Sequence, residues 1–252
     1  MPEFDAAEGG SPIVISGPSG AGKSTLVQRL LTEHSDDVKL SVSYTTRQQR
    51  PGEVDGQHYL FVTQQRFQEL VTAGDMLEWA EVHGNLYGTS AGQIDDIRRQ
   101  GLTPILEIDV RGWEQAKSRM PDAVSIFVLP PSIRSLWRRL KGRGTEDQKT
   151  RWKRLVRGRE EIRLAKSLGY RWFIVNEDGQ QDAAFEELRR IVVRRQNGRI
   201  DRDQGALFCD RLAREFTLFC LWQKPRHLIA RLGSVVQTPS HLARNRLFER
   251  DA

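Results

Sequence analysis

Nine residues near the start of the chain are of the types and spacing that bind the phosphates of a nucleoside triphosphate. The segment Gly17-Pro18-Ser19-Gly20-Ala21-Gly22-Lys23-Ser24-Thr25 completes the pattern G-x-x-x-x-G-K-[ST] and lies between an apolar run and a helical pattern. Glycines let backbone N–H groups turn inward around phosphate oxygens, Lys23 can reach the β- and γ-phosphates, and the Ser24 hydroxyl can hold Mg²⁺. This segment, called the phosphate loop below, predicts a bound nucleoside triphosphate without indicating its fate.

A second group of residues could bind one further phosphate group. Arg47 and Arg50 lie three residues apart, and Tyr59 follows nearby. Guanidinium groups bind phosphate oxygens bidentately, and a phenol can donate one more hydrogen bond. The pattern favours the phosphate of a second substrate, and the alternative is that both arginines merely decorate a surface turn.

Three carboxylates stand where nucleotide chemistry would use them. Glu78 lies in an apolar strand ahead of a Tyr-Gly-Thr-Ser run at 87–90. A half-buried carboxylate beside hydroxyl groups suits a base edge with adjacent N–H donors, such as that of guanine. Glu107 and Asp109 end a core strand, where the acids of α/β nucleotide enzymes gather, and they could hold Mg²⁺ waters or orient arginines. Solvent-facing strand acids are the alternative in each case.

The hydrophobic pattern predicts an α/β scaffold for these residues. Apolar β-rich runs alternate with helical patterns, which is typical of a parallel sheet with helices on both faces. The expected strand and helix pairs are 13–15 with 23–34, 105–110 with 112–119, 124–129 with 132–141, and 172–175 with 181–196. Between the first two pairs the rhythm breaks, which predicts a small, mostly antiparallel inserted lobe with strands at 39–43, 59–63 and 76–82 and a helix at 64–73.

Composition limits the class of protein. The chain has 252 residues, of which 38% are hydrophobic, and this is enough for one sizeable α/β core. The first ten residues carry no apolar run, and no stretch approaches the roughly 18 apolar residues of a membrane span. We therefore expect no secretory signal, no membrane partner and a cytoplasmic location. The two cysteines, Cys209 and Cys220, argue against a disulfide framework or a cysteine metal site and are interpreted as ordinary thiols.

The net charge of +6 is unevenly distributed. Residues 132–171 hold fourteen Arg or Lys against four acids, with apolar residues at helical spacing. Such a stretch favours nucleic acid, a nucleotide with several phosphates, or simply a solvated helix face. After a basic helical segment at 185–214, the composition shifts to aromatic, proline and glycine residues with no sustained helical or strand period, so we expect an appended tail from Glu215 onward.

Several motifs, in order, carry a family resemblance. From about Pro12 to Glu187 the chain closely resembles guanylate kinases, through GPSGAGKST, SVSYTTR with RPGEVDG, HYLFV, EWAEVHGNLYGTS, LEIDV, FVLPPS and RRLKGRGT. The resemblance implies a P-loop three-layer α/β core with a parallel sheet, an inserted small GMP-binding lobe and a helical lid. It also implies an enzyme that moves the γ-phosphoryl group of ATP onto GMP, and onto dGMP, with Mg²⁺, giving ADP and GDP.

The resemblance also divides the chain. It implies a flexible N-terminus at 1–11, a guanylate-kinase-like domain at 12–214 and a C-terminal extension of unknown role at 215–252. Within the domain, the implied parts are a core at 12–37, 90–137 and 169–214, the GMP-binding lobe at 38–89 and the lid at 138–168. The basic stretch at 132–171 is then better interpreted as lid than as a nucleic-acid surface.

Matched by motif, the resemblance assigns roles residue by residue. It implies an ATP site formed by the phosphate loop, Gly17 to Thr25, with Asn176 near the base. The implied metal-holding residues are Ser24 and Asp109. The implied GMP-binding residues are Ser43, Arg47, Arg50, Tyr59, Glu78, Tyr87, Thr89, Glu107 and Asp109. The implied catalytic residues are Lys23, Arg47, Arg139, Arg143 and Arg154.

Some features depart from the family or leave alternatives open. Tyr44 stands where we expect a smaller or more polar residue, and the tail beyond about residue 214 has no counterpart that we recognise. The alternatives are a non-catalytic guanylate-kinase-like protein-interaction module, another small kinase such as a ribose bisphosphate phosphokinase, and a nucleic-acid-binding protein. The sequence leaves the oligomeric state open, a homo-oligomer included.

Overall fold

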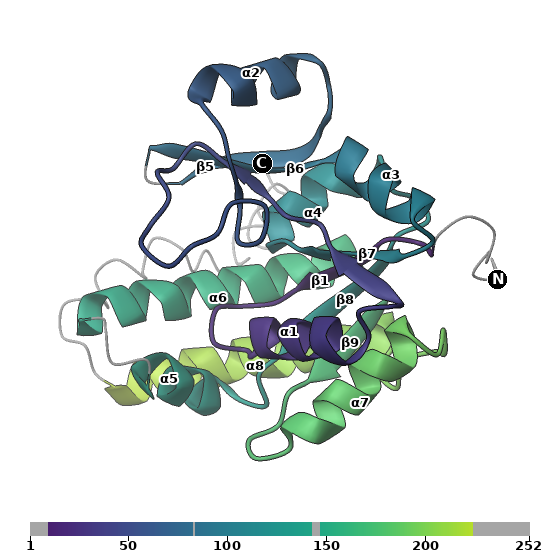
Figure 1. The fold of residues 1–252 in the computed structure, drawn as a ribbon. Coiled ribbons are helices and arrows are strands. Elements are labelled where there is room, and N and C mark those ends of the chain that lie inside the picture. The colour runs from purple at the N-terminus through teal and green to yellow at the C-terminus, as the bar shows by residue number, and fades with distance from the viewer. Residues whose placement is uncertain (1–9, 83, 143–146, 224–252) are drawn as a thin grey trace, which may run out of the picture. The chain divides into compact units, whose positions relative to one another are not determined.

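The computed structural model describes residues 10–82, 84–142 and 147–223 (Figure 1). The chain divides into two compact units, Met1–Phe216 and Thr217–Ala252. The first unit contains both sheets and all the residues singled out for chemistry. None of the helices in the described part of the chain is long and apolar enough to cross a membrane.

A five-stranded parallel sheet forms the core of the first unit. Its strands, in spatial order, are β2 (Val38–Leu40), β7 (Thr103–Glu107), β1 (Ile13–Ser16), β8 (Val124–Leu129) and β9 (Trp172–Val175). All four pairings are parallel. β1 and β8 are buried throughout, as expected for strands covered on both faces. The predicted α/β class and its parallel sheet are confirmed.

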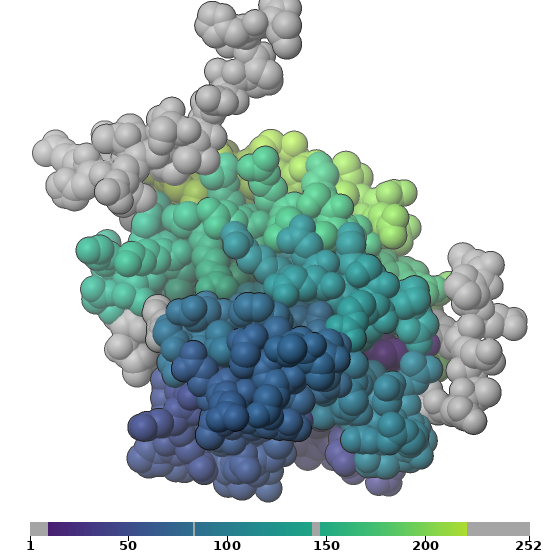
Figure 2. All heavy atoms as spheres, turned by 90° about the horizontal axis from the view of Figure 1, so that it is seen from above, coloured from purple at the N-terminus to yellow at the C-terminus, as the bar shows by residue number. Residues whose placement is uncertain are grey.

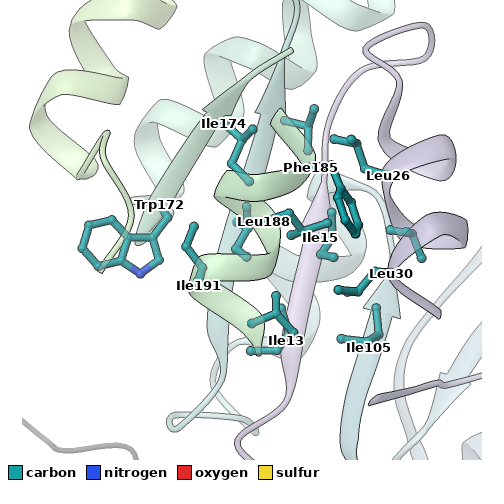
Figure 3. Close-up of a cluster of buried hydrophobic side chains, with 14 of the residues drawn as sticks. Ile13, Ile15, Leu26, Leu30, Ile105, Trp172, Ile174, Phe185, Leu188 and Ile191 are labelled. Atoms are coloured by element: carbon teal, nitrogen blue, oxygen red, sulfur yellow. The ribbon is translucent and has the colours of Figure 1, made fainter. Parts of the chain in front are cut away.

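Helices cover this sheet on two sides. On one side α1 (Lys23–Glu33) and α7 (Gln181–Val192) share a buried cluster with the strands, and Phe185 of α7 points toward Leu26 and Leu30 of α1 (Figure 3). On the other side α4 (Val110–Ala116) packs on β1 and on α6 (Gln148–Leu168). The remaining helices are α3 (Ala91–Arg99), α5 (Ile133–Gly142) and α8 (Arg202–Gln223).

The lobe is a second, four-stranded sheet. Its strands, in spatial order, are β4 (Leu60–Phe61), β3 (Tyr44–Thr45), β6 (Asn85–Ser90) and β5 (Met76–Val82). The two pairings of β6 are antiparallel and β3 with β4 is parallel, so the predicted mostly antiparallel lobe is confirmed. α2 (Gln64–Thr72) closes a small core of its own, and in Figure 2 the lobe, in blue, covers part of the teal segments. Tyr44 packs against that small core, which gives this departure from the family a structural role.

The predicted lobe strand at 39–43 is wrong. Val38–Leu40 pairs in parallel with β7 in the core sheet, with Val38 opposite Thr103. Val38 is buried in the main hydrophobic cluster, so its burial decides which sheet the segment joins. The lobe's first strand is instead β3, which pairs with both β4 and β6.

The expected loss of helical period after Glu215 is wrong as far as Gln223, and the rest of the predicted tail, 224–252, lies outside the described residues. α8 runs without a break from Arg202 to Gln223. Cys209, Leu212 and Phe216 recur at spacings of three and four and are all buried, and this helical period in the sequence predicts the helix. Burial raises the pKa of the Cys209 thiol to about 12, so it stays protonated at neutral pH.

Candidate active site

The phosphate loop is a close turn between β1 and α1. Gly22, just before α1, has φ of +92°, and a Cβ atom there would lie 2.2 Å from Asn176 Nδ2. Gly17 leaves β1 so close to β8 that a Cβ atom would lie 2.5 Å from the Val128 carbonyl oxygen. Only glycine fits both positions, and the loop therefore presents backbone N–H groups at the N-terminus of a helix, where phosphate groups bind.

A polar cluster supports the loop from the side of β9. Asn176 Nδ2 donates to the Ala21 carbonyl over 2.8 Å, and Arg139 Nη1 donates to the same carbonyl over 3.2 Å. Asp178 accepts from Arg139 Nη2 over 2.9 Å and from Ser135 Oγ over 2.7 Å. The hydrogen bond from Ser135, and then those from two arginines, lower the pKa of Asp178 to about 2. Arg139 and Asn176 are thus fixed against the phosphate loop.

Glu107 lies against the phosphate loop itself. It ends β7, the strand next to β1, and its Oε1 accepts from Lys23 Nζ over 2.9 Å and from Ser24 Oγ over 2.6 Å. Both interactions hold side chains at the positions where a triphosphate and its metal ion would be expected. Arg154, from α6, approaches the same loop, with Nη1 3.4 Å from Ser19 Oγ. The remaining predicted arginine, Arg143, lies outside the described residues.

Asp109 faces α6. Its Oδ1 caps α4 by accepting from Gly112 N over 2.9 Å, and its Oδ2 accepts from Arg157 Nη2 over 3.0 Å. Arg157 also donates to Glu161 Oε1 over 3.1 Å, and burial raises the pKa of Glu161. Neither Arg157 nor Glu161 was predicted from the sequence, because Arg157 connects this pair to Asp109, which lies 48 residues away in the chain.

A second cluster, in the lobe, centres on Arg47. Its guanidinium lies 5.5 Å from the centre of the Tyr59 ring, and the rings of Tyr59 and Tyr87 meet edge to face at 5.8 Å. A hydrogen bond with Tyr87 is among the interactions that raise the pKa of Arg47. Burial raises the pKa of Tyr59, so this hydroxyl keeps its proton and can donate it in a hydrogen bond. The structure therefore brings together three of the residues predicted for one phosphate.

Glu53 holds Arg47 in this cluster and was not among the predicted site residues. Arg47 Nη2 donates to both carboxylate oxygens of Glu53, over 2.8 and 3.0 Å. Arg50 N donates to Glu53 Oε2 over 2.8 Å, which ties the two predicted arginines to one acid. The guanidinium of Arg47 lowers the pKa of Glu53, so the carboxylate stays ionised. The signal in the sequence was the acid three residues after Arg50.

Glu78 lies at the border between the lobe and α4. Its Oε1 accepts from Thr89 Oγ1 over 2.7 Å, and a Cβ atom at Gly112 would lie 3.1 Å from its Oε2. Thr89 is buried, and burial raises the pKa of Glu78. Ser43 lies just ahead of β3, where its carbonyl accepts from Leu60 N over 3.0 Å. A desolvated carboxylate beside a hydroxyl group is well suited to accept hydrogen bonds from a polar base.

The family profile described as guanylate kinase matches residues 9–195. The chain belongs to the guanylate kinase family. A guanylate kinase of Shewanella sp. (strain MR-7) is 44% identical over 183 residues, which are 73% of this chain and 86% of that protein. One of Chromobacterium violaceum is 44% identical over 207 residues, which are 82% and 93%. The crystal structure of guanylate kinase from Anaplasma phagocytophilum matches with a TM-score of 0.55 and 31% identity, over 75% of this chain and 87% of that one.

In this guanylate kinase family member, the candidate residues form two groups on different elements. The first surrounds the phosphate loop and contains Lys23, Ser24, Glu107, Arg139, Arg154 and Asn176. The second belongs to the lobe and contains Arg47, Tyr59 and Tyr87, with Glu78 and Thr89 beside α4. A protein with a phosphate loop and a separate cluster of one arginine and two tyrosines can bind two phosphate-bearing ligands.

Proposed function

We propose that the protein transfers the γ-phosphoryl group of ATP to GMP, and to dGMP, giving ADP and GDP. One observation carries the proposal: the chain has both an intact phosphate loop and a separate cluster of arginine and tyrosine side chains around Arg47. In the loop, Lys23 and Ser24 both donate hydrogen bonds to Glu107. The first group suits a polyphosphate donor and the second suits the single phosphate of an acceptor. Membership of the guanylate kinase family supports the same assignment.

Phosphoryl transfer requires positioning and neutralisation of charge more than covalent chemistry from the protein. We assign the donor phosphates to the loop N–H groups and to Lys23, with Arg139 and Arg154 as the cations that offset charge on the moving phosphoryl group. The proposed role of the lid at 138–168 is to exclude water when both substrates are bound, which limits hydrolysis of ATP. No residue need act as a strong base.

The residues at the loop fit Mg²⁺. The hydroxyl oxygen of Ser24 lies 2.6 Å from Oε1 of Glu107, and both are oxygen ligands of the kind that Mg²⁺ prefers. In the described part of the chain there is no group of three or more His, Cys, Asp or Glu residues that could hold a metal ion. Mg²⁺ commonly takes one or two protein oxygens and completes its shell with phosphates and water. We propose that Ser24 and Asp109, with Glu107, hold it directly or through water, and that it supplies positive charge to the donor phosphates.

On the acceptor side, we assign the GMP phosphate to Arg47, Arg50, Tyr59 and Tyr87. Arg47 donates hydrogen bonds to Glu53, and this ion pair orients the guanidinium. We assign the guanine edge to Glu78, with Ser43 and Thr89 around it. Because a desolvated carboxylate needs N–H partners, the N1–H and N2–H₂ groups of guanine suit Glu78 better than the edge of adenine, which offers no such pair.

Several features separate this proposal from its alternatives. A protein-interaction module does not need the hydrogen bond between Lys23 and Glu107 or the approach of Arg154 to Ser19. A ribose bisphosphate phosphokinase does not need a buried glutamate that recognises a nucleotide base. The domain boundaries given above, the cytoplasmic location and the absence of a nucleic-acid partner remain predictions. The oligomeric state stays open.

Chromatographic identification of the products tests the proposed function. Purified, folded protein with ATP, GMP and Mg²⁺ is expected to form GDP and ADP in equal amounts, and chelation of Mg²⁺ is expected to stop both. Substitution of ribose 1,5-bisphosphate for GMP is expected to give no ADP. ADP formed only with the ribose bisphosphate would establish the rival kinase, and no ADP with any acceptor would contradict the proposal.

Glu78→Gln is expected to stabilise the unliganded protein while it weakens recognition of guanine. Burial raises the pKa of Glu78, so the wild-type protein is most stable below the ordinary glutamate pKa and loses stability as the pH rises through the raised value. Glutamine carries no charge to desolvate. We expect the free energy of unfolding of the variant to be about 0.5–2 kcal/mol higher than that of the wild type at neutral pH and nearly equal to it near pH 4. Denaturant unfolding at both pH values measures this difference.

The same variant should lose about a hundredfold in the ratio of kcat/KM for GMP to that for AMP, because the NH₂ group of glutamine, a hydrogen-bond donor, replaces one acceptor oxygen of the carboxylate. Glu81→Gln, in an exposed position of the same strand, is the matched control and should change neither property. A loss of stability at neutral pH, or an unchanged acceptor preference, would contradict the role given to Glu78.

A further inference from the structure

α8 lies antiparallel along α6, the long helix of the lid. At the base of the lid, Lys166 Nζ pairs with both carboxylate oxygens of Asp210 at 2.7 Å. Nearer the start of α6, the Arg159 guanidinium lies 4.9 Å from the centre of the Phe216 ring, and the Trp152 ring lies 6.4 Å from it. The three residues on α6 are spaced by seven, so they share one helix face, and this face meets α8 at Asp210 and Phe216.

α8 also holds the start of α5, the other helix that enters the lid. Glu215 Oε2 accepts from Ile133 N over 3.2 Å, which satisfies an N–H group at the N-terminus of α5. Arg211 Nη2 donates to the Pro131 carbonyl over 3.0 Å. A carboxylate at a helix N-terminus also complements the positive end of the helix dipole.

An aromatic cluster joins the three helices. Trp137 of α5 and Trp152 of α6 meet edge to face at 5.9 Å, and Phe216 of α8 lies beside Trp152 and is buried. Arg139 follows Trp137 by two residues, and Arg154 follows Trp152 by two residues. The cluster therefore fixes the helices at the two positions from which these arginines reach the phosphate loop.

The other end of α8 is anchored to the core sheet. Phe173 N, in β9, donates to the Ile200 carbonyl over 2.9 Å, just before α8 begins. A Cβ atom at Gly205 would lie 1.9 Å from the Phe173 ring, so the helix backbone packs directly on that ring. α8 therefore connects the core sheet to α5 and α6, the two helices that carry Arg139 and Arg154.

We propose that Phe216 is a positioning residue for phosphoryl transfer: through Trp152 and Trp137 it sets where Arg154 and Arg139 lie relative to the phosphate loop. The inference rests on the proposed function, because the arginines matter only if a phosphoryl group is transferred. The residues that we assign to the GMP phosphate and the guanine edge, Arg47 and Glu78 among them, lie on the lobe, and the described contacts of this cluster include none of them. Loss of the ring should therefore change the rate of transfer and leave acceptor binding intact.

Steady-state kinetics of Phe216→Ala test this at a temperature well below its unfolding midpoint. We expect kcat to fall about ten- to a hundredfold, because small misplacements of catalytic groups have effects of this size, while KM for GMP stays within about twofold. Phe216→Leu, which refills most of the space, should recover the greater part of kcat and serves as the test if the alanine variant does not fold. Leu207→Ala, at a position of α8 that is 70% exposed, is the matched control and should resemble wild type.

Amide hydrogen exchange in the unliganded protein supplies a readout that needs no turnover. Phe216→Ala should speed exchange at residues 150–156 of α6, and Leu207→Ala should not. An unchanged kcat in an active Phe216→Ala protein, or a KM for GMP that rises in step with the fall in kcat, would overturn the proposal. A wild-type protein without GDP formation would instead overturn the proposed function, and the exchange data would still report whether Phe216 holds the lid helix.

Discussion

Replacement of Lys23 by alanine is expected to lower kcat for GDP formation by about three orders of magnitude. Loss of one preorganised cation or hydrogen-bond donor at a transferring phosphoryl group costs a factor of this order. In this chain the loss has a second part, since Glu107 Oε1 lies 2.9 Å from Lys23 Nζ. Without the ammonium group, that carboxylate would face the donor phosphates with only the Ser24 hydroxyl as a partner. Rapid-quench measurement of product formation checks the effect on the chemical step.

The acceptor site should survive this change. The cluster around Arg47 belongs to the lobe and does not depend on the phosphate loop, so the Kd of GMP should stay within about twofold by calorimetry. Lys39→Ala is the matched control, because the side chain of this exposed lysine donates a hydrogen bond to Gln100, away from the phosphate loop. A Lys23→Ala protein that keeps more than a tenth of the wild-type kcat would show that the loop does not serve the donor.

Arg47→Ala is expected to lower kcat/KM for every nucleoside monophosphate by about two to three orders of magnitude. A charge-assisted bidentate contact contributes about 1.5–3 kcal/mol, and removal of Arg47 leaves the Glu53 carboxylate without its guanidinium partner beside the incoming phosphate. Repulsion between these two anions adds to the loss. The relative preference for GMP over AMP should change little, because we assign Arg47 to the phosphate and not to the base.

Two further variants separate the roles of charge and geometry. Arg47→Lys keeps the charge but loses the planar fork, and should recover only part of kcat/KM. Arg66→Ala removes an exposed arginine of the same lobe, on α2, and should have no effect. If Arg47→Ala and Glu78→Gln impaired all acceptors equally, the division between phosphate binding and base recognition would be wrong.

The sequence predicted the residues whose chemistry is local. The phosphate loop is a contiguous motif between one strand and one helix, and its glycine positions follow from close approaches to Val128 and Asn176. Arg47 and Tyr59 are close in sequence and are brought together by the pairing of β3 with β4. In both cases, spacing along the chain was enough to predict proximity in space.

Features that depend on distant partners were missed. Val38–Leu40 joins the core because β7, more than sixty residues later, lies beside it, and local alternation cannot distinguish this from a lobe strand. Asp178 was not selected, although it holds Arg139 against the phosphate loop. The role of Phe216 depends on Trp152, so it becomes visible only when α6 and α8 are seen together.

The rate of ADP release across a panel of acceptors is the measurement that tests the central claim most directly. The claim is that the phosphate loop serves the donor and the inserted lobe chooses the acceptor. With ATP and Mg²⁺ fixed, GMP and dGMP should be used, and AMP, UMP and CMP should be at least about a hundredfold poorer by kcat/KM. No ADP release with any purine monophosphate, or equal use of AMP and GMP by the folded wild-type protein, would contradict the claim.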